Sequence, residues 1–258
     1  MIFDAHTHLY QGKLPCQNDF YQLASASTPE ECRTLDTLRA RNPQLYYSCG
    51  IHPWQSEAVP ASALMPWLPN ACAIGEIGMD SVWCSVDLAV QRQAFQSQLS
   101  LAAKLQKPVI LHTKGCEHDV LEHIQAFPFP ILVHWYSCNE HVEDYIKKGC
   151  YFTIGPDLRR NPAVQRLAAL TPLNRLLVES DGVEGVSWAL GRKVSLTETS
   201  NVLRGLIADL SRLRDLPPKA MAEILFRNAL AFLNVTPPAH PAPVRIMAST
   251  LSNKKQIP

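Results

Sequence analysis

The chain opens with the stretch Ile2-Phe3-Asp4-Ala5-His6-Thr7-His8, an apolar run that ends in two histidines. Similar short apolar runs lead into Glu76, His112, His134 and Asp181. Runs of strand length that alternate with helix-period segments indicate βα units and a parallel sheet. In a (β/α)8 barrel the C-terminal strand ends converge on one mouth, so residues far apart in the sequence meet there. The pattern therefore predicts an α/β chain folded as a (β/α)8 TIM-type barrel.

Counting the apolar runs supports a closed barrel. Strands are predicted near 2–5, 22–26, 45–50, 72–76, 108–112, 130–134, 151–154 and 175–179. Helices are expected from Thr28-Pro29 onward, and over 87–106, 139–148, 161–169, 197–214 and 218–233. Eight strands are the number that the fold needs, and a chain of 258 residues with 47% hydrophobic content has the length of one such barrel.

Three segments depart from a regular barrel. Only residues 9–21 separate His8 from the second strand, so we expect a somewhat distorted barrel with a short or missing first helix. Residues 182–196 are predicted as a long loop over the mouth, where loops usually carry specificity. The proline-rich and then Ser/Asn/Lys-rich end predicts a barrel domain over 1–235 and a C-terminal tail over 236–258.

Composition limits the possible partners. The net charge of +1 provides no overall field that would attract nucleic acid or an anionic membrane. No stretch approaches the roughly 18 apolar residues of a membrane span, and an acidic residue stands where a signal peptide would be basic. The eight cysteines form no Cys-x-x-Cys pair and are typical of reduced cytosolic thiols. We expect a cytoplasmic monomer with no membrane partner.

The residues at the strand ends are of the types that bind metal ions. Neutral imidazole and carboxylate suit Zn²⁺, and oxygen-rich positions favour Mn²⁺ or Mg²⁺. Residues two apart on a strand point the same way, so both histidines of His-x-His can bind one ion. Two divalent ions about 3.5–4 Å apart are therefore expected, a spacing that activates water for hydrolysis. The predicted ligands are His6, His8, Glu76, His112, His134 and Asp181.

Any single histidine is more often structural than a ligand, and the joint pattern carries the metal prediction. His118, His123, His141 and His240 lack the strand-end position and are expected to be structural. His52 ends the third strand and is predicted to contact either a metal ligand or the substrate. The candidates for phosphate contacts are Lys114, Arg159 and Arg160, with Arg192-Lys193 in the overhanging segment, although surface cations are usually just solvated.

Several motifs together resemble the TatD family of metal-dependent hydrolases, part of the amidohydrolase superfamily. They are Asp4-Ala5-His6-Thr7-His8-Leu9, Gly50-Ile51-His52-Pro53, Gly75-Glu76-Ile77-Gly78-Met79-Asp80, His112-Thr113, Glu179-Ser180-Asp181 and Arg227-Asn228-Ala229-Leu230-Ala231-Phe232. The resemblance covers about residues 1–233. It implies a TIM-type barrel in which Glu76 replaces the carbamylated lysine that bridges metals in many relatives. It also implies one metal on His6, His8 and Asp181, a second on His112 and His134, and DNase or phosphoesterase activity.

The substrate-facing positions depart from the family's usual pattern. Ser81-Val82-Trp83 follow Asp80, Thr113-Lys114 stand where many members carry Ser-Arg, and Gly182-Val183 follow Asp181. Lysine keeps the charge of arginine but loses its planar fork. The metal ligands are thus all present, whereas the residues around them differ.

The leading hypothesis is a deoxyribonuclease- or exonuclease-like hydrolase that cleaves phosphoester bonds with a metal-activated hydroxide. Asp181 is predicted to orient the hydroxide and accept its proton, and Glu76 to bridge the ions. The substrate would be single-stranded DNA, bound weakly at its ends, or a small phosphoester. One alternative is hydrolysis of a small lactone, amide or phosphoester. Another is a non-catalytic metal-binding scaffold, which would gain nothing from six convergent ligands.

Overall fold

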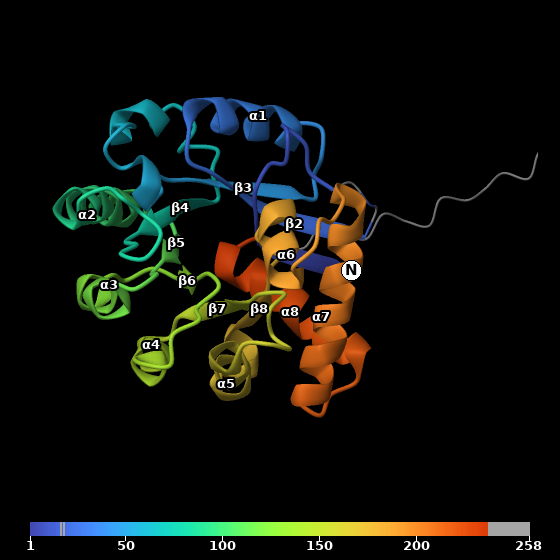
Figure 1. Cartoon of the computed structure of the whole chain (residues 1–258). Helices are drawn as coiled ribbons and strands as arrows, with labels where there is room; N and C mark the ends of the chain where they lie inside the picture. The colour runs from blue at the N-terminus through green and yellow to red at the C-terminus, as the bar shows by residue number, and fades with distance from the viewer. Residues whose placement is uncertain (16, 18, 237–258) are drawn as a thin grey trace, which may run out of the picture.

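The predicted barrel is confirmed in the computed structural model, which describes residues 1–15, 17 and 19–236. Eight parallel strands follow one another around the sheet in sequence order (Figure 1). Their bounds are β1 Ile2–Thr7, β2 Phe20–Ala26, β3 Leu45–Cys49, β4 Ala73–Gly78, β5 Val109–His112, β6 Ile131–Val133, β7 Tyr151–Ile154 and β8 Leu176–Val178. Between the last and first strands, the backbone N–H of Asp181 donates to the carbonyl of His6 at 3.1 Å.

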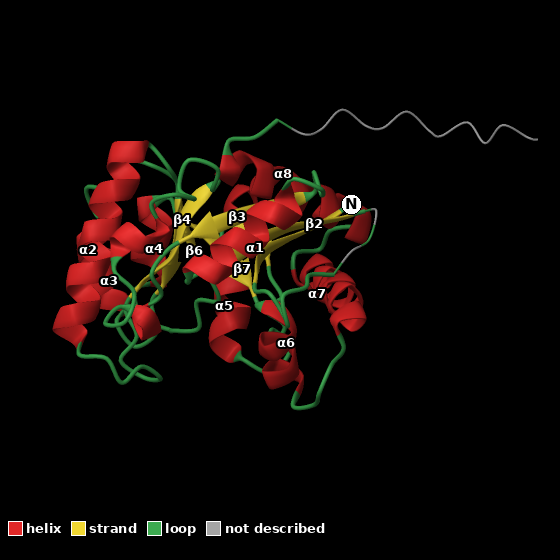
Figure 2. Ribbon diagram, turned by 90° about the horizontal axis from the view of Figure 1, so that it is seen from above, coloured by secondary structure: helices red, strands yellow, loops and turns green. Residues whose placement is uncertain are grey.

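Helices surround the strands (Figure 2). They are α1 Pro29–Arg39, α2 Leu88–Leu105, α3 Glu117–Ile124, α4 Val142–Lys148, α5 Pro162–Leu170, α6 Gly182–Leu190, α7 Thr199–Leu213 and α8 Pro218–Leu233, with short 3-10 turns at Pro53–Gln55, Ala61–Leu64, Leu173–Arg175 and Leu196–Glu198. Local sequence explains where α1 starts. Thr28 and Glu31 form a capping box that satisfies free backbone N–H groups, and Pro29 fits the first helical position.

In its described part, the barrel lacks a helix between β1 and β2, as the sequence predicts. The described residues between β1 and β2 form no helix and contain one isolated bridge, between Tyr10 and Lys13. Helix α7 lies near this flank, and its Arg204 pairs with Asp19 at 3.0 Å. No helix in the described part of the chain is long and apolar enough to cross a membrane. The predicted tail, apart from residue 236, and His240 lie outside the described residues.

The prediction of a loop over 182–196 is wrong for its first half. Residues 182–190 form α6, which continues directly from Asp181. Val183, Val186 and Ala189 recur every three residues and are buried. Two glycines weaken the intrinsic helix propensity of this segment, so its apolar face is what stabilises the helix. Residues 191–195 are irregular, and the short 3-10 turn at Leu196–Glu198 follows them.

The barrel interior is apolar at the end opposite the strand C-termini. Phe3 lies 6.1 Å from Tyr21 and 5.7 Å from Tyr46 between ring centroids, and Phe226 of α8 packs against Phe3 at 6.0 Å. Figure 2 shows α8 and α6 at opposite ends of the strands. Helix α8 therefore closes the N-terminal end of the barrel, and the polar interior residues lie at the other end.

Candidate metal centre

The six predicted ligands converge at the C-terminal ends of the strands, around Glu76. His6 belongs to β1, Glu76 to β4 and His112 to β5, whereas His8, His134 and Asp181 follow β1, β6 and β8. Glu76 Oε2 lies 3.1 Å from His6 Nε2 and 2.7 Å from His134 Nε2. One carboxylate thus contacts imidazoles from two different sides of the barrel.

The first group of ligands consists of His6, His8 and Asp181. Asp181 Oδ1 lies 3.5 Å from His6 Nε2 and 3.3 Å from His8 Nε2, and the two imidazole nitrogens are 3.2 Å apart. His8 and Asp181 are the accessible members, with side-chain exposures of 39% and 24%. This group therefore lies on the solvent side of Glu76, whose side chain is 4% exposed.

The second group includes one residue more than the sequence prediction. His112 Nδ1 lies 3.1 Å from His134 Nε2 and 4.0 Å from Glu76 Oε2. His52 Nε2 lies 3.4 Å from His112 Nδ1 and 3.5 Å from Glu76 Oε1. The structure therefore places His52 among the candidate ligands.

A glycine permits the close approach of β4 and β5 at this centre. Gly78 has φ +145°, a backbone conformation that residues with a side chain rarely adopt. A Cβ at this position would lie 1.9 Å from the carbonyl oxygen of His112. Gly78 is thus required for Glu76 and His112 to lie side by side.

The donor set fits divalent metal ions. In each of three groups the candidate ligand atoms lie within 4.8 Å of one another, and the groups are His6/Glu76/His134, His6/His8/Asp181 and His52/Glu76/His112. Among the described residues, buried Glu76 Oε2 makes no regular hydrogen bond, although it lies 2.7 Å from His134 Nε2. Buried acceptors without partners are costly, and a cation between them satisfies several at once.

The electrostatics of the cluster also favour bound cations. Burial disfavours the charged form of His6, but the negative charge of Glu76 raises its pKa to about 9. Burial opposes ionisation of Glu76 as well, yet the imidazoles of His134 and His6 hold the pKa of that carboxyl well below its usual range. Burial lowers the pKa of His52 to about 3, so this imidazole is neutral and can offer a lone pair. The carboxylate of Glu76 therefore stays ionised at neutral pH.

Sequence reasoning quoted Asp80 in a motif but gave it no role. The structure buries its carboxylate, which lies 3.0 Å from His112 Nε2 and accepts hydrogen bonds from the indole of Trp54 and the backbone of Val82 and Trp83. Acceptors of this kind fix the orientation of a ligating imidazole, so that its other nitrogen faces the metal. Asp80 therefore orients His112 toward Glu76. Its position at the C-terminal end of the β4 motif is the sequence signal that could have identified it.

Glu179 supports His134 in a similar position. Its buried carboxylate lies 3.6 Å from His134 Nδ1, on the side of the ring away from Glu76. Asp4 fixes the neighbouring backbone, because it accepts hydrogen bonds from the hydroxyl and the backbone N–H of Ser180 at 2.6 and 2.9 Å. The residue that precedes Asp181 is thus tied to β1.

The predicted phosphate contacts lie in different environments. Lys114 Nζ donates to Ser137 Oγ at 3.1 Å and lies over the Trp83 ring. Arg159 forms two hydrogen bonds with Asp209 of α7, at 2.5 and 2.9 Å. Arg160 lies near Gly191, where its Nη1 would be 3.9 Å from a Cβ. Lys114, Arg159 and Arg160 stay predicted substrate contacts, as does His52.

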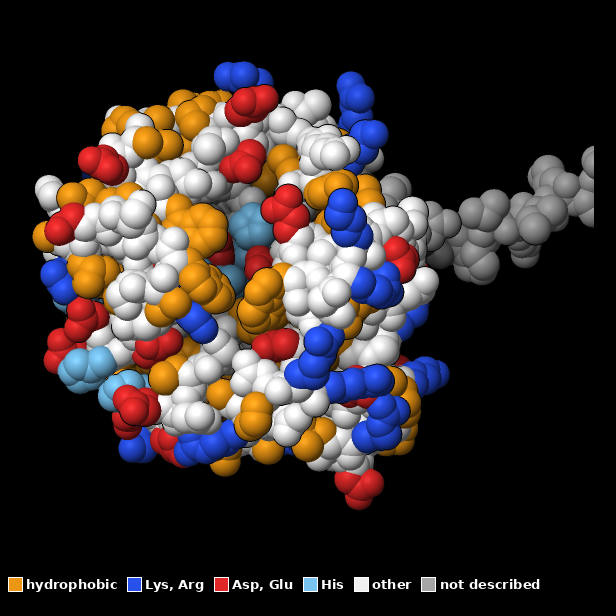
Figure 3. Space-filling view, viewed as in Figure 1, with side chains coloured by type: hydrophobic (Ala, Val, Ile, Leu, Met, Phe, Trp, Pro, Cys, Tyr) orange, Lys and Arg blue, Asp and Glu red, His pale blue; other side chains and the backbone are white. Residues whose placement is uncertain are grey.

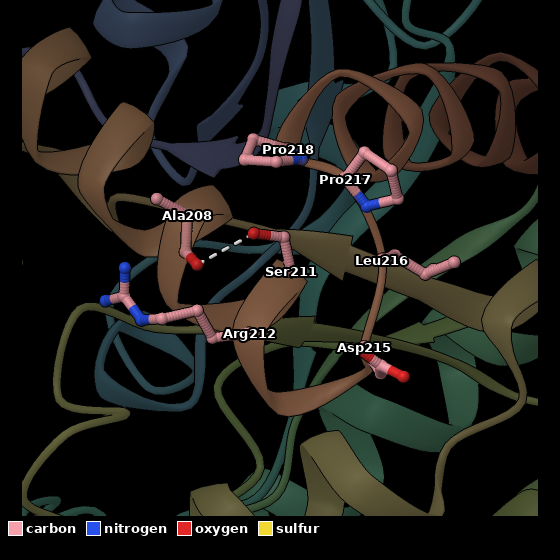
Figure 4. A pocket seen from close by; sticks show the side chains of 7 residues that line it. All are labelled: Ala208, Ser211, Arg212, Asp215, Leu216, Pro217 and Pro218. Carbon is pink, nitrogen blue, oxygen red and sulfur yellow. Dashed lines mark hydrogen bonds between the residues drawn. The ribbon is translucent and has the colours of Figure 1, made fainter.

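Arg192, three further histidines and the pocket of Figure 4 contribute no residue to the three candidate ligand groups. Arg192 pairs with Glu198 at 3.1 Å. His118 and His123 belong to α3, and His141 lies directly before α4. Figure 4 shows a pocket where α7 meets α8, in which Ser211 donates to the carbonyl of Ala208. Its lining contains no candidate metal ligand: Ala208, Ser211, Arg212, Asp215, Leu216, Pro217 and Pro218.

Comparison with known proteins shows relatives of similar sequence and fold. The chain is similar to the 3'-5' ssDNA/RNA exonuclease TatD of Citrobacter koseri, with 29% identity over 171 residues that cover 62% of this chain and 66% of that protein. It is 30% identical to the protein of the same name from Erwinia billingiae over 173 residues, with coverages of 62% and 66%. The similarity thus spans about two thirds of the length of these relatives.

Solved structures show the same fold. The TatD homologue YJJV of Escherichia coli K12 matches with a TM-score of 0.73 at 24% identity, covering 84% of this chain and 87% of that one. A TatD family hydrolase of Entamoeba histolytica matches with a TM-score of 0.69 at 14% identity, covering 90% and 97%. The family model for TatD related DNase matches residues 3–234. The chain therefore belongs to the TatD related DNase family.

Proposed function

We propose that this protein is a divalent-metal-dependent hydrolase that removes nucleotides from the ends of single-stranded nucleic acid. The observation that carries the proposal is the position of Glu76 between two groups of ligand side chains. The relatives named as 3'-5' ssDNA/RNA exonucleases support the substrate class and the direction of cleavage.

Two ions are proposed, sharing Glu76. His6, His8 and Asp181 would hold one ion, and His112 and His134 the other, with His52 close enough to add a nitrogen. Zn²⁺, Mn²⁺ and Mg²⁺ are the candidates, since imidazole and carboxylate donors are both present. Such ions, when bound, lower the pKa of water and polarise a phosphoryl oxygen.

Asp181 is the proposed proton acceptor. Its side chain is more exposed than that of Glu76, so it reaches the solvent side of the centre. Burial alone would raise the pKa of Asp181, but its contacts with His6 and His8 hold the pKa below the usual range. Asp181 is thus ionised at neutral pH, and it can orient an attacking water molecule and accept its proton.

The other residues hold this arrangement in place. Glu76 stays ionised and fixed between the histidines, Asp80 orients His112, and Glu179 places a negative charge 3.6 Å from His134 Nδ1. Lys114 is proposed to contact a substrate phosphate near the centre, together with Arg159 and Arg160 farther out. A monomeric, cytoplasmic protein that binds single-stranded DNA ends weakly is part of the same proposal.

A second candidate is hydrolysis of a small phosphoester, lactone or amide at the same centre. The observation in its favour is the pairing of Arg159 with Asp209 and of Arg192 with Glu198, which leaves fewer cations free for a polyanion. Barrels support many chemistries at one mouth, so the metal centre alone does not separate the two candidates.

The test uses the full chain, stripped with a chelator and reloaded separately with Zn²⁺, Mn²⁺ or Mg²⁺. A 5'-labelled single strand should yield a ladder that shortens from the 3' end, and Glu76→Ala should abolish the ladder. Cleavage of a small ester or lactone without any cleavage of the oligonucleotide would establish the second candidate instead. Metal binding without either activity would support the alternative of a non-catalytic metal-binding scaffold.

A further inference from the structure

Four of the five tryptophans follow metal-centre residues along the chain. Trp54 comes two residues after His52, and Trp135 comes directly after His134. Trp83 lies shortly after Asp80, and Trp188 lies in α6, the helix that begins directly after Asp181. The strand ends that deliver the ligands therefore also deliver large aromatic rings to the mouth. The fifth tryptophan, Trp67, is partly buried against the outer core.

The rings of three tryptophans form a continuous chain of contacts at this mouth. The centroids of Trp83 and Trp188 lie 6.3 Å apart, and those of Trp135 and Trp188 lie 5.7 Å apart. Trp54 lies 5.1 Å from the His52 ring. Figure 3 shows hydrophobic side chains around a hollow in which histidine and acidic side chains are visible. Trp54, beside His52, and Trp135, directly after His134, thus border the metal centre.

Two of these rings are fixed and two present open faces. The indole nitrogen of Trp54 donates to Asp80 at 2.9 Å, and that of Trp135 donates to Asp157 at 2.8 Å. Gly155 makes room for Trp135, because a Cβ there would lie 2.5 Å from the ring. Trp83 and Trp188 are 56% and 64% exposed. Neither of their indole nitrogens has a hydrogen-bond partner in the described part of the chain.

Exposed aromatic clusters of this kind mark binding sites, since large apolar side chains rarely gather in water without a partner. A positive charge lies against the cluster, because Lys114 Nζ is 4.8 Å from the centroid of the Trp83 ring. Aromatic faces beside a lone cation and a metal centre match one nucleotide, in which a flat base adjoins a phosphate. The same set of aromatic faces with one neighbouring cation fits a long polyanion or an apolar helix less well, because the first needs several cations and the second needs none.

We propose that Trp83 and Trp188 form a stacking platform for the base of the nucleotide next to the cleaved phosphate. Lys114 contacts the phosphate on the same side. The proposal rests on the proposed nuclease function and specifies how its substrate is held. Stacking uses the face that every base has, so the platform tolerates any sequence. It also selects unpaired strands, because the faces of bases in a duplex are already covered by their neighbours.

The test compares two short oligonucleotides of the same length and phosphate number. One is tetrathymidylate, and in the other every base is replaced by an abasic tetrahydrofuran unit. Dissociation constants are measured by fluorescence anisotropy of 5'-dye-labelled strands with the chelator-treated full chain, so that the readout does not depend on the tryptophans. Trp188→Ala and Trp83→Ala should each weaken binding of tetrathymidylate about 5- to 150-fold, the range that corresponds to loss of one base–aromatic stack. Binding of the abasic strand should stay unchanged.

Two further variants separate stacking from structural effects. Trp188→Phe keeps an aromatic face and should retain most of the affinity for tetrathymidylate. Trp67→Phe changes a tryptophan that packs against the core outside the ring cluster, and it should change neither affinity. Equal weakening of both oligonucleotides by Trp188→Ala, or no weakening of either, would overturn the platform.

The outcome for the platform is distinguishable from the outcome for the nuclease function. If no divalent ion supports cleavage but Trp188→Ala weakens only the base-bearing strand, the platform stands and the nuclease proposal fails. If the reloaded enzyme cleaves oligonucleotides but the abasic strand binds as tightly as tetrathymidylate, the nuclease proposal stands and the platform is overturned.

Discussion

The two ends of the same barrel carry opposite kinds of side chain. At the N-terminal end, Phe3 and Tyr21 point inward and pack against Phe226 of α8. At the C-terminal end, the inward positions are imidazoles and carboxylates around Glu76. Burial of aromatic rings stabilises the fold, whereas burial of charged groups costs free energy unless they are paired. The N-terminal end of the barrel thus contributes mainly to stability, and the C-terminal end carries the groups that can do chemistry, as is general for this fold.

This contrast predicts that changes at the mouth lower activity and changes at the closed end lower stability. The largest effect is expected for Glu76→Ala, which removes the carboxylate that lies within 4.0 Å of histidines from both ligand groups. We expect activity to fall by more than the roughly 10²–10⁴-fold that loss of one general base costs. Metal analysis of the reloaded protein should show that most of the bound metal is lost. A variant that keeps both ions would exclude a bridging role for Glu76.

The next largest effect on activity is expected for Asp181→Asn. The amide keeps an oxygen near His6 and His8 but cannot accept a proton, so kcat should fall about 10²–10⁴-fold. The thermal midpoint should stay close to that of the parent chain. Glu184→Gln, an exposed change one turn along α6, serves as the control and should leave kcat unaltered. Near-normal turnover by Asp181→Asn would transfer the proton-accepting role to another group.

At the closed end, Phe226→Ala should lower the free energy of unfolding by about 3–5 kcal/mol, as for other buried aromatic residues. Denaturant unfolding of the metal-free protein measures this loss. The kcat of the folded fraction should be unchanged, since Phe226 lies against Phe3 and Tyr21 at the end opposite the ligands. Phe226→Leu retains most of the volume and should cost less. A drop in kcat without a loss of stability would contradict the division between the two ends.

A smaller effect is expected for Asp80→Asn, which tests whether orientation of His112 matters. Loss of the carboxylate behind a ligating imidazole typically costs about 10–100-fold in metal affinity. Competition with a fluorescent chelator should show this loss at one of the two ions only, because Asp80 contacts His112 and none of the first group. Trp54→Phe removes one hydrogen bond to Asp80 and should have a weaker effect in the same direction. If Asp80→Asn lowers the affinity for both ions equally, or for neither, relative to the parent chain, Asp80 does not orient His112.

The smallest effect is expected for charge reversal at the outer cations. Arg159→Glu with Arg160→Glu should raise KM for oligonucleotides at low salt and barely affect a small phosphodiester. Because Arg159 is already paired with Asp209, the increase should be smaller than that of Trp188→Ala. Asp209→Asn frees Arg159 and is the matched variant, which should lower KM if this cation reaches the substrate. An increase that persists at high salt would indicate a change of shape rather than of charge.

The sequence by itself determined the strand count, the type of barrel and the donor chemistry at the strand ends. These features are local, since apolar runs, strand spacing and side-chain identity are all visible within a few residues. His6, His8, Glu76, His112, His134 and Asp181 could be named because they share one local context. The missing first helix was visible for the same reason, as a short interval between strands.

Only the tertiary structure decided what depends on partners far along the chain. Helix α6 forms because Val183 and Val186 are buried, although two glycines weaken its local signal. Asp80 gains a role from His112, 32 residues away, and Arg159 is paired with Asp209, 50 residues away. The tryptophans at the mouth become one surface only when the ends of separate strands meet. Contacts of this kind arise from closure of the barrel, and no local pattern in the sequence encodes which side chains it brings together.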